Sequence, residues 1–312
     1  MNQRKPPPPI IGESSAIRRG VELVERYAHT ELPVLLVGTT GTGKELFAEH
    51  LHWRSGRPER LVAVNCAALP RDTAESLLFG HRKGAFTGAV ESRRGYLRCA
   101  NRGTLFLDEV LDLPPEVQPK LLRALDLGEV QPLSEDAPEY VDLRVVAAVQ
   151  DDVSARLEAG VFRRDLFQRL AGIVIRLPPL VARPEDILPL ARHFAAAQGQ
   201  AVGPGVEPIL RGYPWPGNAR ELRLAVERAC ALAPNGCLSA AVLAEAIELG
   251  AVPSRGNGDG HPDDLRRQLV QTLATHRWNA ERAAIALGVH RATLFRHLKG
   301  FGLSIRSLRK SQ

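Results

Sequence analysis

The segment GTTGTGKE, residues 38–45, places three glycines and a lysine between an apolar run and a stretch with helical spacing. The spacing G-x-x-x-x-G-K predicts a P-loop, in which backbone N–H groups and a helix N-terminus cradle phosphates. A glycine-rich turn that arises by chance is the alternative, and the order strand, loop, helix disfavours it. A magnesium-binding Ser or Thr usually follows the lysine, whereas this chain has Glu45. The residues expected to contact ATP here are Gly38, Thr39, Thr40, Gly41, Thr42, Gly43, Lys44 and Glu45.

A second chemical group is the acidic pair Asp108 and Glu109, which ends the apolar run GTLFLDEV. A strand that ends in two acids places them at the carboxyl edge of the sheet, where open α/β folds bind ligands. We expect Asp108 to hold Mg²⁺ through water and Glu109 to polarise the attacking water. Alone, such a strand end is often only a capped turn. Together with the P-loop it predicts ATP binding and hydrolysis.

The elements that must position these groups alternate along the first 180 residues. The apolar runs LPVLLVG, LVAVNC, GTLFLDEV and LRVVAAVQ are typical of buried parallel strands, and amphipathic segments separate them. The pattern predicts an α/β fold, a doubly wound parallel sheet. The predicted organisation is a disordered start at 1–9, the α/β subdomain at 10–180, an all-helical lid at 181–250, a linker at 251–261 and a helical domain at 262–312.

The composition predicts a globular cytoplasmic protein. Hydrophobic residues make up 44% of the chain and charged residues 24%, and the four cysteines lack the spacing of a metal site. No apolar run in the sequence approaches the roughly 20 residues of a membrane span. The first residues lack the apolar core of a secretion signal.

The positive charge is concentrated at the end of the chain. Residues 261–312 contain ten Lys and Arg and three acids, a net charge of +7, whereas the whole chain carries +6. This charge favours a nucleic-acid module, with a solvated basic helix as the alternative.

The sequence NAERAAIALGVHRATLFRHLKGFG, from residue 279, predicts two helices around a glycine corner, a helix-turn-helix. In this arrangement Ala283, Ala284 and Leu287 face Leu294 and Leu298. The second helix would enter the major groove of DNA. We expect base contacts from His290, Arg291 and Thr293 and phosphate contacts from Arg296 and Lys299.

One further segment, GAFTGA at residues 84–89, fits neither a core strand nor an ordinary polar loop. Gly84 and Gly88 allow the backbone to change conformation, and Phe86 offers an exposed aromatic anchor beside the hydroxyl of Thr87. A loop packed under a neighbouring helix is the alternative interpretation.

The segments GTTGTGKE, GAFTGA, GTLFLDEV, FRRDLFQRL and WPGNARELR occur in this order. Over residues 10–250 the chain resembles the AAA+ ATPases that activate transcription with sigma-54 RNA polymerase, the bacterial enhancer-binding proteins, and its end resembles Fis-type DNA-binding domains. The resemblance implies that the protein assembles into a ring, a hexamer, and that the GAFTGA loop touches sigma-54. The residues of that contact are Gly84, Ala85, Phe86, Thr87, Gly88 and Ala89.

The resemblance also assigns roles to single residues. Asn65 looks like the switch that restrains the catalytic Glu109 until ATP arrives. Arg163 and Arg169 match arginines that reach into the neighbouring subunit's nucleotide site, for which a solvated basic helix face is the alternative, and Arg220 matches the lid arginine that senses the γ-phosphate.

Several positions depart from the family pattern. AAVQ at 147–150 replaces the usual AATN, so Val149 and Gln150 stand where polar residues near the γ-phosphate are expected. Arg82, Arg98 and Arg164 each replace a common Glu, and QPLSEDAPEY at 131–140 lacks the usual Arg-Val-Gly-Gly. These departures concern the rate of hydrolysis and its coupling to the loop, while the main catalytic groups are intact.

The sequence as a whole predicts a transcription activator that binds upstream double-stranded DNA, hydrolyses ATP between subunits and remodels sigma-54 polymerase toward an open complex. Two alternatives stay open: a DNA-binding regulator that acts by occupancy with a weak or inactive ATPase, and an AAA+ remodeller of other proteins. The family's receiver or ligand-sensing domain cannot fit into nine residues ahead of the ATPase. Control by a separate inhibitor or co-activator protein, or by expression level, is therefore the hypothesis for regulation.

Overall fold

The computed structural model describes most of the chain from residue 6 onward. The residues outside the description are 1–5, 151–152, 234–235, 251–261, 277, 281–282, 284–293, 296–297, 299–300, 302 and 304–312. The chain divides into two compact units, the first formed by Met1–Val202 with Pro214–Leu238 and the second by Gly203–Tyr213 with Ser239–Gln312.

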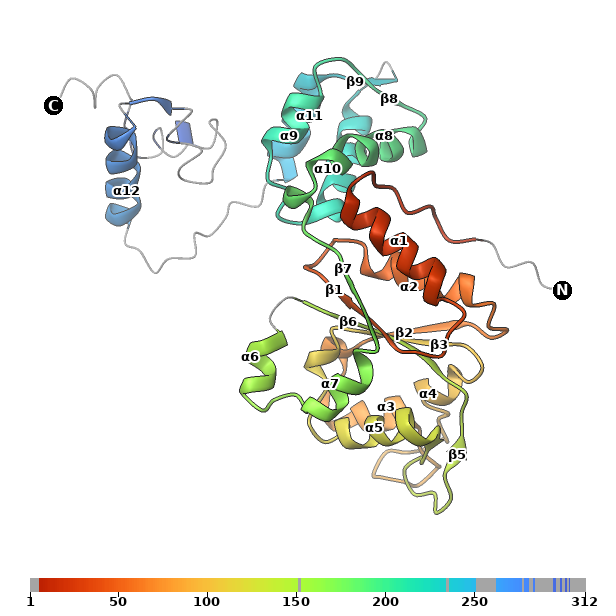
Figure 1. Ribbon diagram of the computed structural model, residues 1–312. Helices are drawn as coiled ribbons and strands as arrows, with labels where there is room; N and C mark the ends of the chain where they lie inside the picture. Colours follow the sequence, from red (N-terminus) through yellow and green to blue (C-terminus); the bar gives the residue numbers. More distant parts are fainter. Residues whose placement is uncertain are drawn as a thin grey trace. The chain divides into compact units, whose positions relative to one another are not determined.

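A five-stranded sheet of order β2-β3-β6-β1-β7 forms the centre of the first unit, and all its neighbouring strands are parallel (Figure 1). The strands are β1 Val34–Val37, β2 Leu61–Asn65, β3 Thr104–Asp108, β6 Arg144–Val149 and β7 Ile173–Arg176. Four of them are the predicted apolar runs, so the predicted α/β fold is confirmed. The fifth strand, β7, was not identified from the sequence. It is a short edge strand with two of its four residues exposed, so it does not form a continuous apolar run.

Helices cover both faces of this sheet (Figure 1). On one face, α1 Ser15–Tyr27 and α2 Lys44–Ser55 share a buried core with alternate residues of the strands. On the other face lie α3 Arg71–Phe79, α4 Tyr96–Cys99, α5 Gln118–Leu127, α6 Val153–Glu158 and α7 Arg164–Leu170. Because successive strand residues point to opposite faces, the nearly continuous apolar strands supply both cores.

The turns between these elements carry short pieces of regular structure. Three-residue 3₁₀ helices occur at η1 Cys66–Ala68, η2 Val110–Asp112, η3 Leu180–Ala182 and η4 Pro184–Asp186. A two-stranded antiparallel hairpin joins β4 Glu129–Val130 and β5 Glu139–Tyr140. This hairpin contains residues 131–140, one of the segments in which the sequence departs from the family pattern.

The first unit ends in a helical lid. Helices α8 Ile187–Ala197 and α10 Asn218–Leu232 pack against each other, and a short parallel pair joins β8 Ala201–Val202 to β9 Cys237–Leu238. The prediction that residues 181–250 are only helical was therefore wrong at these strands. Two residues per strand are too few to produce an alternating sequence pattern.

The second unit contains α9 Glu207–Gly212, α11 Ala240–Gly250 and α12 Pro262–Thr275. Leu269 and Leu273 of α12 form a small buried cluster with Ala283, Leu294 and Leu298. The predicted packing of Ala283 against Leu294 and Leu298 is confirmed, whereas Ala284 and Leu287 lie outside the described residues.

Candidate nucleotide site and GAFTGA loop

The segment of residues 38–45 forms a tight loop between β1 and the first turn of α2. Gly41 and Gly43 have φ of 79° and 109°, in the left-handed region that favours glycine. A Cβ on Gly41 would lie 2.3 Å from the Gly217 carbonyl oxygen, so the lid backbone passes directly against this turn. The ammonium of Lys44 is buried and donates to the carbonyl of Gly38 at 2.6 Å. The loop is thus closed on itself, with its lysine at the base, as in a P-loop.

The acidic pair lies at the same carboxyl edge of the sheet as this loop. Asp108 is the last residue of β3, and its carboxylate accepts a hydrogen bond from the Glu109 N–H at 3.1 Å. Glu109 has φ of 52°, a left-handed conformation that is uncommon for a residue other than glycine. Such backbone conformations persist where the surrounding structure enforces them, and they cluster at functional sites.

Two amide side chains lie at the same edge. Asn65 ends β2 in register with Asp108, and its side-chain oxygen accepts from the Ala68 N–H at 3.3 Å. Gln150 follows β6, and its Nε2 donates to Glu109 Oε1 at 3.2 Å. Sequence reasoning noted Gln150 only as a departure from the family, but in this structure its amide, rather than that of Asn65, contacts the glutamate.

The thiol of Cys66 lies next to this edge. It is buried, and its pKa is raised by burial and further by the nearby acids Asp108, Asp112 and Glu109. Cys66 is therefore a neutral packing residue. Within the part of the chain that the structure describes, there is no cluster of three or more His, Cys, Asp or Glu side chains able to hold a metal ion.

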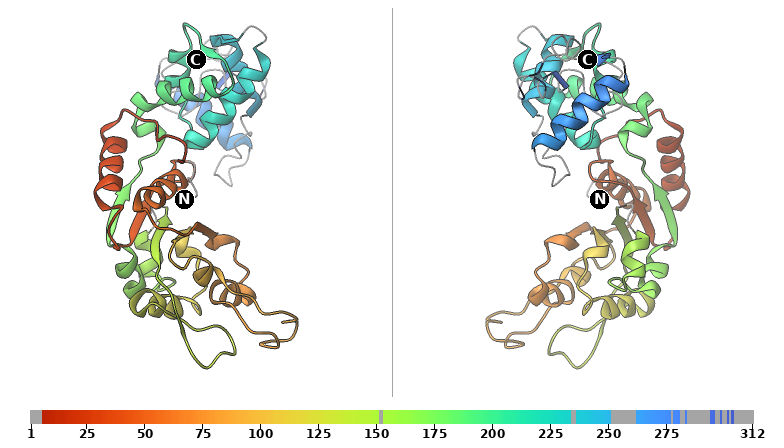
Figure 2. Two further views of the ribbon diagram at one scale, coloured as in Figure 1. Left: turned by 90° about the vertical axis from the view of Figure 1, so that its right-hand side faces the viewer. Right: turned by 90° about the vertical axis from the view of Figure 1, so that its left-hand side faces the viewer.

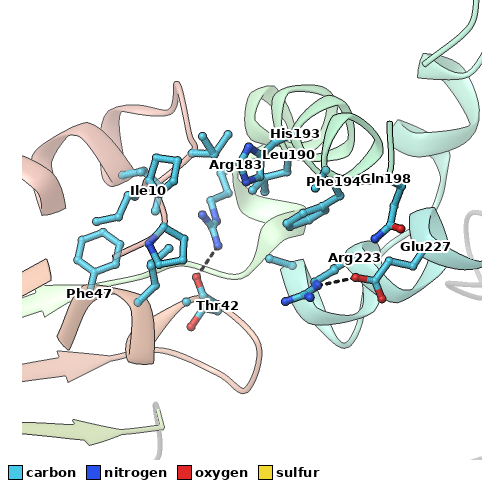
Figure 3. Close-up of a pocket in the computed structure, with 18 residues that line it drawn as sticks. Ile10, Thr42, Phe47, Arg183, Leu190, His193, Phe194, Gln198, Arg223 and Glu227 are labelled. Atoms are coloured by element: carbon cyan, nitrogen blue, oxygen red, sulfur yellow. Dashed lines mark hydrogen bonds and ion pairs between the residues drawn. The ribbon is translucent and has the colours of Figure 1, made fainter. Parts of the chain in front are cut away.

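The lid is tied to the P-loop by two buried residues that sequence reasoning missed. Asn218, in WPGNAR, donates to the Thr39 hydroxyl at 3.1 Å and the Thr40 carbonyl at 2.8 Å, and its oxygen accepts from the Leu180 N–H. Arg183 donates to the Thr42 carbonyl at 3.0 Å (Figure 3). Asn218 could have been found from the sequence, because it stands two positions before Arg220, a residue already expected near the phosphates. The Cβ of Arg220 does lie near Gly41, and its side chain is exposed.

Arg183 also pairs with a buried carboxylate. Its guanidinium lies 3.5 Å from the Asp186 carboxylate, and burial lowers the pKa of Arg183. Asp186 in turn accepts from the Ser14 N–H at 2.7 Å and the Ser14 hydroxyl at 2.6 Å. The start of α1, the lid and the P-loop therefore meet in one hydrogen-bonded network.

A cavity of about 390 Å³ opens beside the P-loop (Figure 3). Thr42, Gly43 and Phe47 form the α2 side, and the lid supplies Arg183 and Phe194. Its remaining lining residues are Pro8, Pro9, Ile10, Ile11, Ile17, Leu46, Leu190, His193, Ala197, Gln198, Ala219, Arg223 and Glu227. A largely apolar cavity that adjoins Thr42 and Gly43 of this loop suits a purine nucleoside whose phosphates reach the P-loop.

The GAFTGA segment forms a compact loop after α3. Gly84 and Gly88 have φ of 84° and 101°, and a Cβ on either would meet nothing within 4 Å. Glycine is thus favoured here by backbone conformation and not by lack of space. Phe86 is 42% exposed and contacts the edge of the His81 ring, with the ring centroids 5.0 Å apart.

The base of this loop is fixed on two sides. His81 and Arg93 exchange backbone hydrogen bonds, and Leu133 of the β4–β5 connection donates to the Gly80 carbonyl at 3.0 Å. Two ion pairs join the same segments: Arg82 with Glu135 at 2.7 Å, and the largely buried Arg98 with Glu139. Figure 2 shows both loops extending from the same end of the α/β part of the first unit.

Of the two arginines expected at a subunit boundary, one lies in α7 and the other directly before it. Arg163 precedes the helix and pairs with Asp165 at 2.7 Å, and Arg169 pairs with Asp126 of α5 at 2.9 Å. Each of these side chains is about half exposed. The expected DNA-contact residues, His290, Arg291, Thr293, Arg296 and Lys299, all lie outside the described residues.

The family model described as "Sigma-54 interaction domain" matches residues 10–176, and the one described as "AAA+ ATPase lid domain" matches residues 182–258. The chain belongs to the sigma-54 interaction domain family. The predicted family, the AAA+ fold and the presence of a lid are thereby confirmed.

Similar proteins of this family are transcription regulators. The hydrogenase transcriptional regulatory protein HoxA of Cupriavidus necator is 39% identical over 90% of this chain and 63% of its own length. The C4-dicarboxylate transport regulatory protein DctD of Rhizobium meliloti is 38% identical over 95% of this chain and 65% of its own length. The nitric oxide reductase transcription regulator NorR2 of Cupriavidus necator is 48% identical over 70% of this chain and 44% of its own length. The chain thus spans less than two thirds of the length of these curated relatives.

Solved structures share this fold. NtrX from Brucella abortus, crystallised in complex with ATP, is 31% identical and matches 96% of this chain and 71% of its own with a TM-score of 0.68. RuvB of Thermotoga maritima, at 18% identity and a TM-score of 0.51 over 94% of this chain and 88% of its own, shares the fold. Among the residues that the structure describes, no helix is long and apolar enough to span a bilayer.

Proposed function

We propose that this chain is an ATP-driven activator of sigma-54-dependent transcription. The observation that supports it most is the combination, on one α/β unit, of a closed P-loop, an acidic pair at the adjoining sheet edge and an exposed GAFTGA loop. ATP binds with its base in the cavity of about 390 Å³ and its phosphates on residues 38–45. ATP hydrolysis then changes the loop contacts, because only contacts that differ between nucleotide states can shift an equilibrium in the polymerase.

Mg²⁺ would be held by oxygen ligands at the sheet edge. Asp108 keeps one carboxylate oxygen that is not engaged by the Glu109 N–H, and carboxylates and phosphates suit this ion. The Thr42 hydroxyl donates to the Thr39 carbonyl at 2.8 Å, and Glu45 takes the place of the usual hydroxyl ligand. The metal would neutralise charge on the phosphates. Glu109 orients the attacking water, and Arg220 meets the γ-phosphate from the lid.

The second part of the proposal concerns partners. The GAFTGA residues contact sigma-54, while residues 262–312 bind double-stranded DNA through His290, Arg291 and Thr293. Their net positive charge and the buried cluster of Leu269, Leu273, Ala283, Leu294 and Leu298 support a folded, DNA-binding helical domain. Ring assembly, with Arg163 and Arg169 reaching the neighbouring nucleotide, completes the active site.

The decisive experiment separates ATP hydrolysis from sigma-54 capture and promoter melting. We expect Glu109→Gln to bind ATP but to lose at least about 100-fold in hydrolysis rate, whereas Thr87→Val keeps hydrolysis and fails to capture sigma-54 or to melt a sigma-54 promoter. Thr73→Val, the same substitution at an exposed threonine of α3, serves as the control for Thr87. Undetectable turnover by the unaltered chain would favour regulation by occupancy, and promoter melting by Thr87→Val would contradict the proposed role of the loop.

A further inference from the structure

The proline-rich segment ahead of the ATPase is held in place at both of its ends. The carbonyl of Pro8 accepts a hydrogen bond from His50 Nε2 at 2.7 Å, and His50 belongs to α2, the helix that follows the P-loop. A few residues later, the N–H groups of Glu13 and Ser14 donate to the buried Asp186 carboxylate at 2.5 and 2.7 Å. The chain between these anchors therefore has a defined path.

This path runs along the candidate nucleoside cavity. Pro8 and Pro9 line the cavity together with Phe47 of α2 and Phe194 of α8. Both prolines are exposed to solvent, as expected for residues at the rim of a cavity that a ligand would cover. One helix, α2, thus lines the cavity through Leu46 and Phe47 and anchors the proline segment through His50.

Proline is chemically suited to this position. A prolyl residue has no backbone N–H, so a proline segment can lie against the face of a purine ring without leaving a buried donor unsatisfied. Its fixed φ also means that little conformational entropy is lost when the segment becomes ordered over a ligand. A glycine- or serine-rich segment would carry free N–H groups and a larger entropic cost.

We propose that Pro8 and Pro9, anchored to α2 by His50, form a wall over the purine base of bound ATP and ADP and slow their release. The proposal rests on the nucleotide site proposed above. It adds residues outside the P-loop, the acidic pair and the lid to the determinants of nucleotide affinity.

The test measures binding of ADP that carries a fluorescent group on its ribose, using the full chain. We expect His50→Ala and the double variant Pro8→Gly/Pro9→Gly to raise the Kd about fivefold, mainly through faster dissociation. Pro6→Gly is the matched control, because Pro6 is exposed and lies outside the cavity lining. Inhibition by tripolyphosphate, which has phosphates but no base, should be the same in all four proteins.

Two results would contradict the proposed role of Pro8 and Pro9. One is an unchanged Kd and dissociation rate for both altered proteins; the other is a loss of tripolyphosphate affinity equal to the loss of ADP affinity, which would indicate damage to the P-loop. If the unaltered chain bound no nucleotide, the proposed site itself would be wrong. Normal nucleotide binding without sigma-54 capture would contradict the proposed function and leave the wall intact.

Discussion

At the scale of single residues, the carboxylate of Glu109 is oriented by its neighbours. Its backbone N–H is engaged by Asp108, its φ of 52° directs the residue away from the strand, and Gln150 donates to Oε1 at 3.2 Å. An amide that donates to a carboxylate restricts the side-chain rotamers that the carboxylate can adopt. Gln150 is therefore a positioning residue for the group that we expect to orient water.

We predict that Gln150→Ala lowers kcat for ATP hydrolysis about tenfold, the effect of one lost hydrogen bond of about 1 kcal/mol or slightly more. KM for ATP should change less than twofold, because Gln150 contacts the glutamate and not the P-loop. Steady-state kinetics at saturating protein concentration measure both. Gln150→Asn keeps the amide one methylene shorter and should recover part of the rate. A wild-type kcat in Gln150→Ala would show that the contact has no role in turnover.

At the scale of elements, the GAFTGA loop is connected to the nucleotide edge through the β4–β5 hairpin. From Glu109 the chain passes through η2 and α5 into β4. Leu133, three residues after β4, donates to the Gly80 carbonyl at the base of the loop. The ion pairs of this junction use Arg82 and Arg98 with Glu135 and Glu139. The two acids of the β4–β5 hairpin thus pair with the two arginines that stand where the family commonly has glutamates.

The two pairs differ in which partner is buried: the Arg98 side chain is 10% exposed and Glu139 51%, whereas the Arg82 side chain is 66% exposed and Glu135 15%. Loss of Glu139 leaves a buried guanidinium without its carboxylate, whereas loss of Glu135 leaves a guanidinium that water can solvate. We predict that Glu139→Gln lowers the unfolding free energy by about 1 kcal/mol, a shift in Tm of roughly 2–4 °C. The matched variant Glu135→Gln should stay within about 0.5 kcal/mol of the unaltered protein. Thermal unfolding measures both values.

The same Glu139→Gln variant should keep ATP hydrolysis and lose sigma-54 capture, because the hairpin holds the loop and not the nucleotide. Equal Tm losses in both variants would contradict the difference in burial. Retained sigma-54 capture in Glu139→Gln would show that the Arg98 pair does not position the loop.

At the scale of the whole molecule, the arginines of α7 are paired within their own subunit. Arg163 makes a two-pronged contact to Asp165, whose pKa is lowered by it, and Arg169 pairs with Asp126. Ring assembly would have to exchange these carboxylates for the phosphates of a neighbour. Hydrolysis is therefore expected to depend on protein concentration.

We predict that Glu109→Gln and the double variant Arg163→Ala/Arg169→Ala are each inactive alone and active when mixed. In an equal random mixture, about one interface in four pairs an intact Glu109 with intact arginines from its neighbour, so about a quarter of the wild-type rate should return. Arg164→Ala, the exposed neighbour on the same helix, is the control and should hydrolyse ATP normally. No recovery on mixing would place the arginines in their own subunit's site.

The P-loop, the acidic pair, the α/β class and the family could be predicted from the residues alone, because they depend on local spacing and on apolar runs that need no knowledge of contacts. The sequence also placed Ala283 against Leu294 and Leu298, since helical periodicity fixes which residues share a face. Only the tertiary structure brought Gln150 to Glu109, Asn218 and Arg183 to the P-loop, Glu139 to Arg98, and Pro8 to His50. In each of these pairs the two residues are at least 41 positions apart in the sequence. The physical reason is that polar contacts between distant segments depend on how strands, helices and lid pack, and one sequence carries no periodic signal of such meetings.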